Sequence, residues 1–210
     1  MVIFSTSYLP SVEYLSAFWG AEEVFIEQHE NFIKQTYRNR CIIPTANGVL
    51  PLTIPVKKGG LHNCPINQIE IDFSQPWQRN HWRTIETAYN TSPFFLYYRD
   101  YFEPFYTQQN ISSLFEYNIQ LLDLILKLIG IKKQYLLTSE YVAVYDRGIN
   151  DFRQDIHPKS KIVNNIFPPY RQVFADRLGF IPNMSCIDLL FNEGKFAKDY
   201  LEEVVKTSKQ

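Results

Sequence analysis

Apolar and polar side chains alternate along residues 38–57, and this period of two predicts a β-hairpin. Asn47 and Gly48 lie between the two runs, and Asn-Gly is the commonest two-residue turn between antiparallel strands. With that turn, Cys41 would face Ile54 across the hairpin. One face then carries an apolar set that suits a core, namely Cys41, Ile43, Leu52, Ile54 and Val56.

The opposite face of this hairpin would carry three cations, and these predict an anion site. Arg38 would face Lys57, and Arg40 would lie roughly 7 Å from Arg38 at about 3.3 Å per residue. Like charges that face each other destabilise a sheet, and a bound anion would relieve that repulsion. A phosphate-bearing or sugar small molecule is therefore the expected partner. The other interpretation is a solvated basic face that pairs with acidic neighbours such as Glu27, Glu30 or Asp72.

The N-terminal pattern predicts a strand over residues 2–8, a helix over residues 11–20 and a second strand over residues 23–27. Ser11 can cap the helix. A strand-helix-strand unit is normally parallel and right-handed, and its ligands lie beyond the carboxyl ends of the strands. This rule places Tyr8, a candidate substrate-binding residue, and the three residues before it near a pocket mouth.

The rest of the chain predicts further strands and helices. Two strands are expected, over residues 66–72 and 132–140. Helices are expected to begin near residues 74, 113, 185 and 195. Together the pattern predicts one mixed α/β domain over residues 1–210, with an N-terminal strand-helix-strand unit, a long β-hairpin and flanking helices.

Two features of the helical region have both a structural and a functional interpretation. His81 shares an apolar stripe with Trp77 and Ile85, so a core histidine bonded to a main-chain group is favoured over a catalytic one. Residues 92–106 are dense in Phe and Tyr, and core packing is favoured over stacking of a sugar or base.

Bulk composition excludes several classes of function. The 210 residues carry a net charge of −1, so no basic field indicates a nucleic-acid partner. No apolar run approaches the roughly 20 residues that a membrane-spanning helix needs. Three widely spaced cysteines fit reduced thiols in the cytoplasm better than a disulfide framework. Cys41, Cys64 and His62 lack the paired spacing of a zinc site, so no metal is expected, and the cofactor stays open.

Residues 151–159 carry ionisable side chains at every second position, and an extended chain would place them on one face. His157 precedes Pro158, which disfavours a helical conformation at His157. Asp155 could orient its imidazole, and this pair is a candidate general acid or base. Arg153 would share the face and is a candidate substrate-binding residue. The other interpretation is an edge strand whose charged outer face prevents aggregation.

Six short motifs follow one another along the chain, at residues 8–10, 35–40, 52–57, 77–89, 93–95 and 182–194. In this order and spacing they resemble the WbqC-like family of bacterial proteins, over nearly the whole chain. The site candidates that this resemblance supports are Arg38, Arg40, Lys57 and Asn183. Many members open with a His-Gln-Pro-like element where this chain has Phe4, Ser5 and Thr6, and the variant resembles a Bacteroidetes-type branch.

The resemblance implies a role in surface-polysaccharide synthesis and the transfer of an amino-acyl group, such as glycine, to a sugar. The resulting hypothesis is a cytoplasmic transferase whose hairpin cations hold a phosphate-bearing substrate. His157, oriented by Asp155, would act as acid or base. The rival hypothesis is a non-catalytic module that binds a nucleotide, a sugar phosphate or a partner protein through the same basic face.

Overall fold

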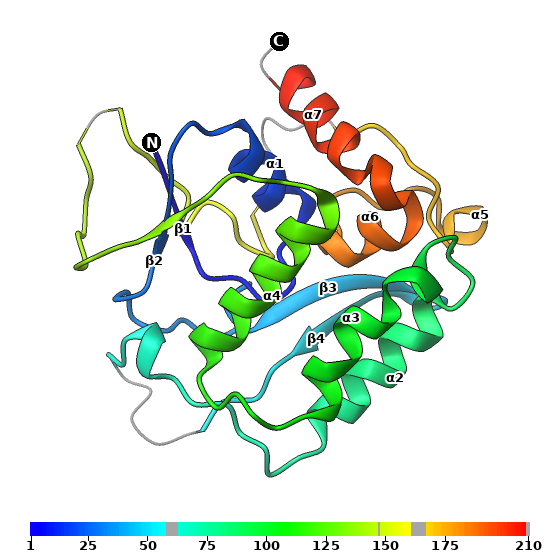
Figure 1. Cartoon of the computed structure of the whole chain (residues 1–210), viewed down its shortest axis with the longest axis horizontal. Helices are drawn as coiled ribbons and strands as arrows, with labels where there is room; N and C mark the ends of the chain where they lie inside the picture. The colour runs from blue at the N-terminus through cyan, green and yellow to red at the C-terminus, as the bar shows by residue number, and fades with distance from the viewer. Residues whose placement is uncertain (58–62, 147, 161–166, 209–210) are drawn as a thin grey trace.

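The structure, a computed structural model, describes residues 1–57, 63–146, 148–160 and 167–208. Within these residues it contains a four-stranded sheet, a separate two-stranded hairpin and helices packed around both (Figure 1). The predicted mixed α/β class is confirmed. No helix in the described part of the chain is long and apolar enough to cross a membrane.

The four-stranded sheet is parallel and has the order β5-β2-β1-β6. Its strands are β1 (Val2–Ser5), β2 (Val24–Glu27), β5 (Leu136–Leu137) and β6 (Asn150–Asp151). Helix α1 (Val12–Gly20) connects β1 to β2, which confirms the predicted strand-helix-strand unit. Because every neighbouring pair is parallel, the carboxyl ends of the four strands meet at one edge of the sheet.

Both ends of α1 are held by polar contacts. The Ser11 Oγ accepts a hydrogen bond of 3.3 Å from the Tyr14 N–H, which satisfies one of the free donors of the first turn. At the other end, the Lys133 Nζ donates to the carbonyl oxygens of Phe18 at 3.3 Å and Trp19 at 2.5 Å. A cation at a helix C-terminus is favourable because the last carbonyl groups carry partial negative charge.

The hairpin consists of β3 (Arg40–Thr45) and β4 (Gly48–Thr53). Its predicted apolar face is confirmed, since four members of the set are buried: Cys41, Ile43, Leu52 and Ile54. The predicted register is wrong by two residues, because Cys41 pairs with Leu52 rather than with Ile54. A shift of two residues keeps every side chain on its face, since side chains alternate with a period of two.

The turn explains this shift. Thr45 pairs with Gly48, so the loop residues are Ala46 and Asn47. A type I′ turn over Asn47 and Gly48 would need positive φ at both residues, and of the two only Gly48 has positive φ, at 109°. The Thr45 Oγ1 also donates to the Gly48 carbonyl at 2.8 Å.

Helices cover the sheet and the hairpin. They are α2 (Trp77–Tyr89), α3 (Phe95–Thr107), α4 (Leu114–Ile129), α5 (Ala175–Leu178), α6 (Cys186–Glu193) and α7 (Ala197–Thr207). Figure 1 shows α2 beside α3 next to the hairpin, and α1 packs on α7. Of two further predicted strands, one does not form and the other is much shorter than expected. Residues 66–72 form a 3₁₀ turn (Ile66–Gln68) and isolated bridges, and residues 132–140 retain only β5.

An aromatic cluster joins α2, α3 and α6. The Phe191 ring lies 5.2 Å from the Tyr89 and Phe95 rings and 5.5 Å from the Phe102 ring, with edge-to-face geometry in each case. The predicted core packing of residues 92–106 is therefore confirmed for one side of α3. The opposite side exposes three large side chains, namely Leu96, Tyr97 and Tyr101.

Gly194 ends α6 in a conformation that other residues rarely adopt, with φ +58° and ψ −124°. A Cβ atom at this position would lie 2.7 Å from ring atoms of Phe94. Gly194→Ala is therefore expected to destabilise the protein by about 2 kcal/mol, measured by urea unfolding.

Gly130→Ala is the matched control for this prediction. Gly130 also has positive φ, at 81°, but nothing lies within 4 Å of its Cβ position. Gly130→Ala is expected to lower the free energy of unfolding by only about 1 kcal/mol, because alanine is strained in the left-handed backbone conformation. Equal losses for the two variants would contradict the role assigned to Phe94.

Candidate functional site

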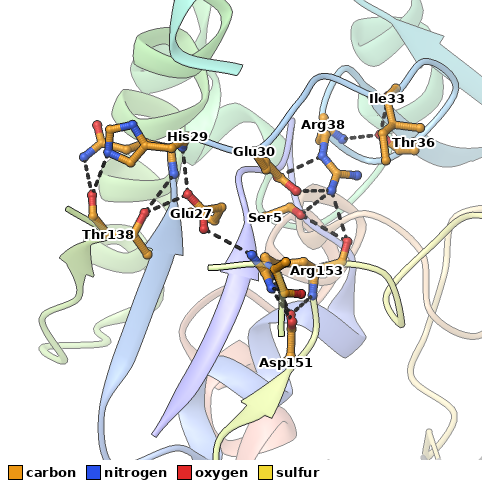
Figure 2. A network of polar contacts seen from close by, with 12 residues as sticks. Ser5, Glu27, His29, Glu30, Ile33, Thr36, Arg38, Thr138, Asp151 and Arg153 are labelled. Carbon is orange, nitrogen blue, oxygen red and sulfur yellow. Dashed lines mark hydrogen bonds and ion pairs between the residues drawn. The ribbon is translucent and has the colours of Figure 1, made fainter. Parts of the chain in front are cut away.

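A network of buried charged groups lies at the carboxyl edge of the parallel sheet (Figure 2). Ser5 is the last residue of β1, Glu27 is the last residue of β2 and Asp151 is the last residue of β6. Parallel topology brings these three strand ends together. Two arginines from the loops that follow β2 and β6, Arg38 and Arg153, enter the same edge and pair with acidic groups.

Arg38 is paired with Glu30 inside the protein. The Arg38 Nε donates to the Glu30 Oε1 at 2.9 Å, and its Nη2 pairs with the Glu30 Oε2. The same Nη2 contacts the Ser5 Oγ at 2.7 Å and the Arg153 carbonyl oxygen at 3.2 Å. Arg38 and Glu30 are each only 3% exposed. A bidentate pair in this setting commits the guanidinium to internal partners.

Arg153 bridges two carboxylates. Its Nη2 lies 2.6 Å from the Asp151 Oδ2, and its Nη1 lies 3.2 Å from the Glu27 Oε2. The guanidinium carbon lies 5.2 Å from the Tyr141 ring and 4.9 Å from the Tyr145 ring. The hydrogen bonds with Asp151 raise the pKa of Arg153 above its ordinary value. Partial burial acts to raise the pKa of Asp151, but the Arg153 bonds outweigh burial, and the net shift is downward.

Glu27 is fully buried and satisfied by several donors. Its Oε1 accepts from the His29 N–H at 2.7 Å and from the Thr138 Oγ1 at 2.8 Å, and its Oε2 pairs with Arg153. Within the described residues, the network therefore sets two guanidinium groups against the carboxylates of Glu27, Glu30 and Asp151. The carboxylates outnumber the guanidinium groups by one, so the network is not a free basic patch.

The three hairpin cations do not form the predicted shared face. β3 begins at Arg40, so Arg38 precedes the paired strands, and its side chain turns inward to Glu30. The predicted pairing of Arg38 with Lys57 is wrong for this reason. Lys57 pairs with Glu70 on the surface, and that hydrogen bond raises the pKa of Lys57. Arg40 is half-buried, and its Nε donates to the Thr53 Oγ1 at 3.1 Å.

Two of these cations act electrostatically on His157. Burial lowers the pKa of His157, and the positive charges of Lys159, Arg38 and Arg40 lower it further. Arg38 and Arg40 thus act on His157 electrostatically, although they precede it by more than 100 positions in the sequence. The imidazole is half-buried and thus accessible to a small molecule.

The hydrogen bonding of His157 defines what its ring can do. Its Nδ1 lies 3.0 Å from the Lys159 main-chain nitrogen, whose N–H can only donate. We assign the lone pair to Nδ1 on this basis, so the neutral ring carries its hydrogen on Nε2. The free nitrogen is thus a hydrogen-bond donor. In this arrangement His157 is suited to hold an anion rather than to remove a proton.

Residues 151–159 do not share one face, contrary to the prediction. The strand ends at Asp151, and the chain turns over the next residues. Arg153 points into the network because Glu27 and Asp151 bind it there. Asp155 is exposed, and the described residues show no hydrogen bond between Asp155 and His157.

A small pit lies at the end of β1, beside this network. Its polar lining comes from Ser5, Thr6 and Ser7, which follow one another, and from Arg38 and two tyrosines; Phe152 and Ile156 complete the wall. The prediction that the end of the first strand borders a pocket is consistent with this arrangement. Tyr37, one of the two tyrosines, is largely buried, and burial raises its pKa to about 12.

The structure places the other two candidates away from the network. Tyr8 is fully buried, and its hydroxyl lies 3.0 Å from the His81 Nδ1 and 2.9 Å from the Tyr106 hydroxyl. Asn183 accepts from the Glu13 N–H at 2.9 Å and donates to the Glu13 Oε2 at 3.0 Å, and so helps to hold the first turn of α1.

Sequence reasoning missed Glu27 and Glu30 as members of the site, although it placed Ser5 near a pocket mouth. Glu27 and Glu30 were expected only as neutralising neighbours, although they lie at and just beyond the end of a predicted strand. The rule that ligands lie at the carboxyl ends of parallel strands points to both positions.

The described residues contain no group of three His, Cys, Asp or Glu side chains that could hold a metal ion. Cys41 and Cys186 are buried free thiols, and Cys64 is half-buried. His62 lies outside the described residues. Nothing in the described geometry points to a particular cofactor.

Comparison with known proteins gives the family. A family model described as the WbqC-like protein family matches residues 6–157. The chain is also 25% identical, over 227 aligned positions and 96% of each chain, to "Uncharacterized protein Rv1507c" of Mycobacterium tuberculosis (strain ATCC 25618 / H37Rv). No solved structure matches the chain significantly. Since the family model covers more than half of its length, the chain belongs to the WbqC-like protein family.

Proposed function

We propose that the protein binds a phosphate-bearing small molecule at the carboxyl edge of its parallel sheet, with Arg40 and His157 as contacting side chains. The observation that supports this is the half-buried His157 ring, whose Nδ1 accepts from the Lys159 N–H so that Nε2 carries the hydrogen. The charges of Lys159, Arg38 and Arg40 lower the pKa of this ring, which indicates a positive field there. A bound anion would offset that field and accept a hydrogen bond from the imidazole Nε2. Ligands of parallel α/β sheets bind at this edge.

We further propose that the ligand is a substrate of surface-polysaccharide assembly in the cytoplasm and that the protein transfers an amino-acyl or related group to a sugar. The family resemblance supports this reaction. Arg40 and the His157 Nε2–H would stabilise negative charge that develops on the phosphate, which is commonly a large part of such catalysis.

A non-catalytic binding module is the second candidate, and one observation favours it. The His157 Nδ1 already accepts from the Lys159 N–H, and Asp155 does not orient the ring. An acid–base role would require the ring to leave this arrangement, whereas a binding role would not.

Arg40→Met is expected to weaken binding of inorganic diphosphate by about 1–3 kcal/mol, the range of a charge-assisted hydrogen bond. His157→Phe removes the Nε2 donor and is expected to act in the same direction. Isothermal titration calorimetry at fixed, low ionic strength measures both effects, since exposed charges are screened by salt.

Lys57→Met is the matched control, because Lys57 pairs with Glu70 at the surface rather than with the network. It is expected to leave the affinity unchanged. Equal affinity of the wild type and the Arg40→Met/His157→Phe double variant would overturn the proposed site. A loss with Lys57→Met as large as that with Arg40→Met would favour the three-cation face instead.

Turnover of nucleotide-sugar and amino-acyl donors by the purified protein separates the two functions. If His157 transfers a proton, His157→Gln should lower turnover by roughly 10²–10⁴-fold. If the protein is a binding module, diphosphate binds and no donor is consumed.

A further inference from the structure

A groove opens between the tip of the hairpin and helix α2. Its volume is about 520 Å³, which lies within the range of small-molecule sites. Residues of the turn and of β4 line one side, and residues of the last two turns of α2 line the other. Phe174, which directly precedes α5, completes the lining. The groove is thus large enough for a small organic molecule.

The apolar part of this lining is hairpin surface that the core leaves uncovered. Leu50 pairs with Ile43, so the two side chains lie on the same face of the hairpin. Ile43 is fully buried, whereas Leu50 is 39% exposed and its neighbour Val49 is 53% exposed. Exposed apolar side chains in a concave site favour a ligand that removes them from water.

Arg83 brings a positive charge into the groove. Among the described residues that line the groove, Arg83 alone is charged. Its guanidinium forms no hydrogen bond or ion pair with the described part of the chain. Glu86, the acidic residue of α2, pairs with Arg99 at 2.9 Å instead. A ligand with one negative charge would therefore complement the groove.

The hydroxyl groups of the groove leave the donor role to other side chains. Three threonines, Thr45, Thr84 and Thr87, each donate to a main-chain carbonyl oxygen at 2.7–2.8 Å. They can accept a further hydrogen bond but have no second hydrogen to donate. The Arg83 guanidinium and the Asn47 side-chain amide remain as donors. The planar guanidinium matches the geometry of a carboxylate.

We propose that this groove binds a small carboxylate with an apolar or aromatic body. The carboxylate pairs with Arg83, and the body lies on Leu50 and Val49. This site goes beyond the proposed phosphate site and does not depend on it. Arg40 begins β3 and Thr45 ends it, so the groove lies roughly 16 Å along the strand from Arg40 at about 3.3 Å per residue.

A pair of matched probes tests the role of Arg83. 3-Phenylpropionate and 3-phenylpropionamide share an apolar body and differ in charge. By isothermal titration calorimetry at low ionic strength, the wild type is expected to bind the carboxylate about 10-fold more tightly than the amide. Arg83→Met should remove this preference and leave the affinity for the amide unchanged. Arg79→Met is the control, because Arg79 lies one turn earlier on α2, is exposed and is outside the groove.

Leu50→Ala tests the apolar contact. It is expected to lower the affinity for both probes by about 3- to 10-fold and to keep the preference for the carboxylate. Acetate, which lacks the apolar body, should bind much more weakly than 3-phenylpropionate. Acetate that binds as tightly would show that the guanidinium acts without the groove and would overturn the proposal.

The remaining outcomes are equally decisive. Equal affinity of the wild type for the two probes, or no binding of 3-phenylpropionate, overturns the carboxylate site. A dimer in analytical ultracentrifugation that Leu50→Ala dissociates would show that a second copy of the chain fills the groove, and this would also overturn it. The Arg40→Met/His157→Phe variant should bind 3-phenylpropionate as the wild type does, even if the phosphate site fails. A loss with that variant would place the carboxylate at the sheet edge and contradict the proposal.

Discussion

Arg38→Met is expected to destabilise the folded protein by about 3–5 kcal/mol, the cost of leaving one member of a buried ion pair without its partner. Glu30 would keep its place in the interior, where it is 3% exposed, and would lose both guanidinium contacts. Methionine fills much of the volume of the arginine side chain, so the loss reports mainly on charge. The free energy of unfolding from urea titration at pH 7 measures it.

Two further variants make this prediction specific. Arg38→Met/Glu30→Leu removes both charges and is expected to recover most of the lost stability. Arg99→Met is the matched surface control, since Arg99 pairs with Glu86 at 2.9 Å in a partly exposed setting. That control is expected to cost at most about 1 kcal/mol.

The behaviour of Arg38→Met distinguishes a structural role of Arg38 from a role in binding an anion. A stable Arg38→Met protein that loses only its affinity for phosphate would support the anion site that the sequence predicted. A large loss of stability that the double variant repairs would show that Arg38 is a structural residue at the carboxyl edge of the sheet rather than a ligand-binding one.

The hairpin shows what a periodic pattern can predict. Its buried face follows from alternation alone, so Cys41, Ile43 and Leu52 were assigned to the core even though the pairing was wrong by two residues. The turn depends on the φ angles of Asn47 and Gly48, and two adjacent residue types do not determine those angles.

The site was less predictable because distant segments build it. Ligands of parallel sheets lie beyond the carboxyl ends of the strands, and this rule predicted the edge of the sheet at which the site lies. The residues at and after the end of β1 do line a pit there. The partners of Arg153 depend on where Glu27 lies, and these residues are 126 positions apart. That long-range ion pair overrides the local alternation of residues 151–159. The inward turn of Arg38 likewise depends on Glu30, which the sequence offered only as one of several acidic neighbours.

Acidification is expected to destabilise the protein by about 2.5 kcal/mol at pH 4.5 through His81 alone. Burial lowers the pKa of His81 from 6.5 to about 4, and a hydrogen bond with the Thr53 main chain offsets only part of this effect. Between pH 6.5 and pH 4 the unfolded chain therefore binds a proton that the folded protein excludes. Stability from this group is fully present above pH 6.5 and falls as the pH drops toward 4, by about 1.36 kcal/mol per unit.

His81→Gln isolates this contribution, because glutamine does not titrate and can still accept a hydrogen bond from the Tyr8 hydroxyl. Other groups also respond to acid. The pKa of His157 is lowered as well, whereas burial raises the pKa of Asp188 and gives the opposite slope. These contributions are common to both proteins, so the difference in unfolding free energy between pH 7 and pH 4.5 should be smaller for His81→Gln by about 2.5 kcal/mol. Equal differences would show that His81 does not remain neutral in the core and that the Tyr8–His81 contact does not depend on the neutral ring.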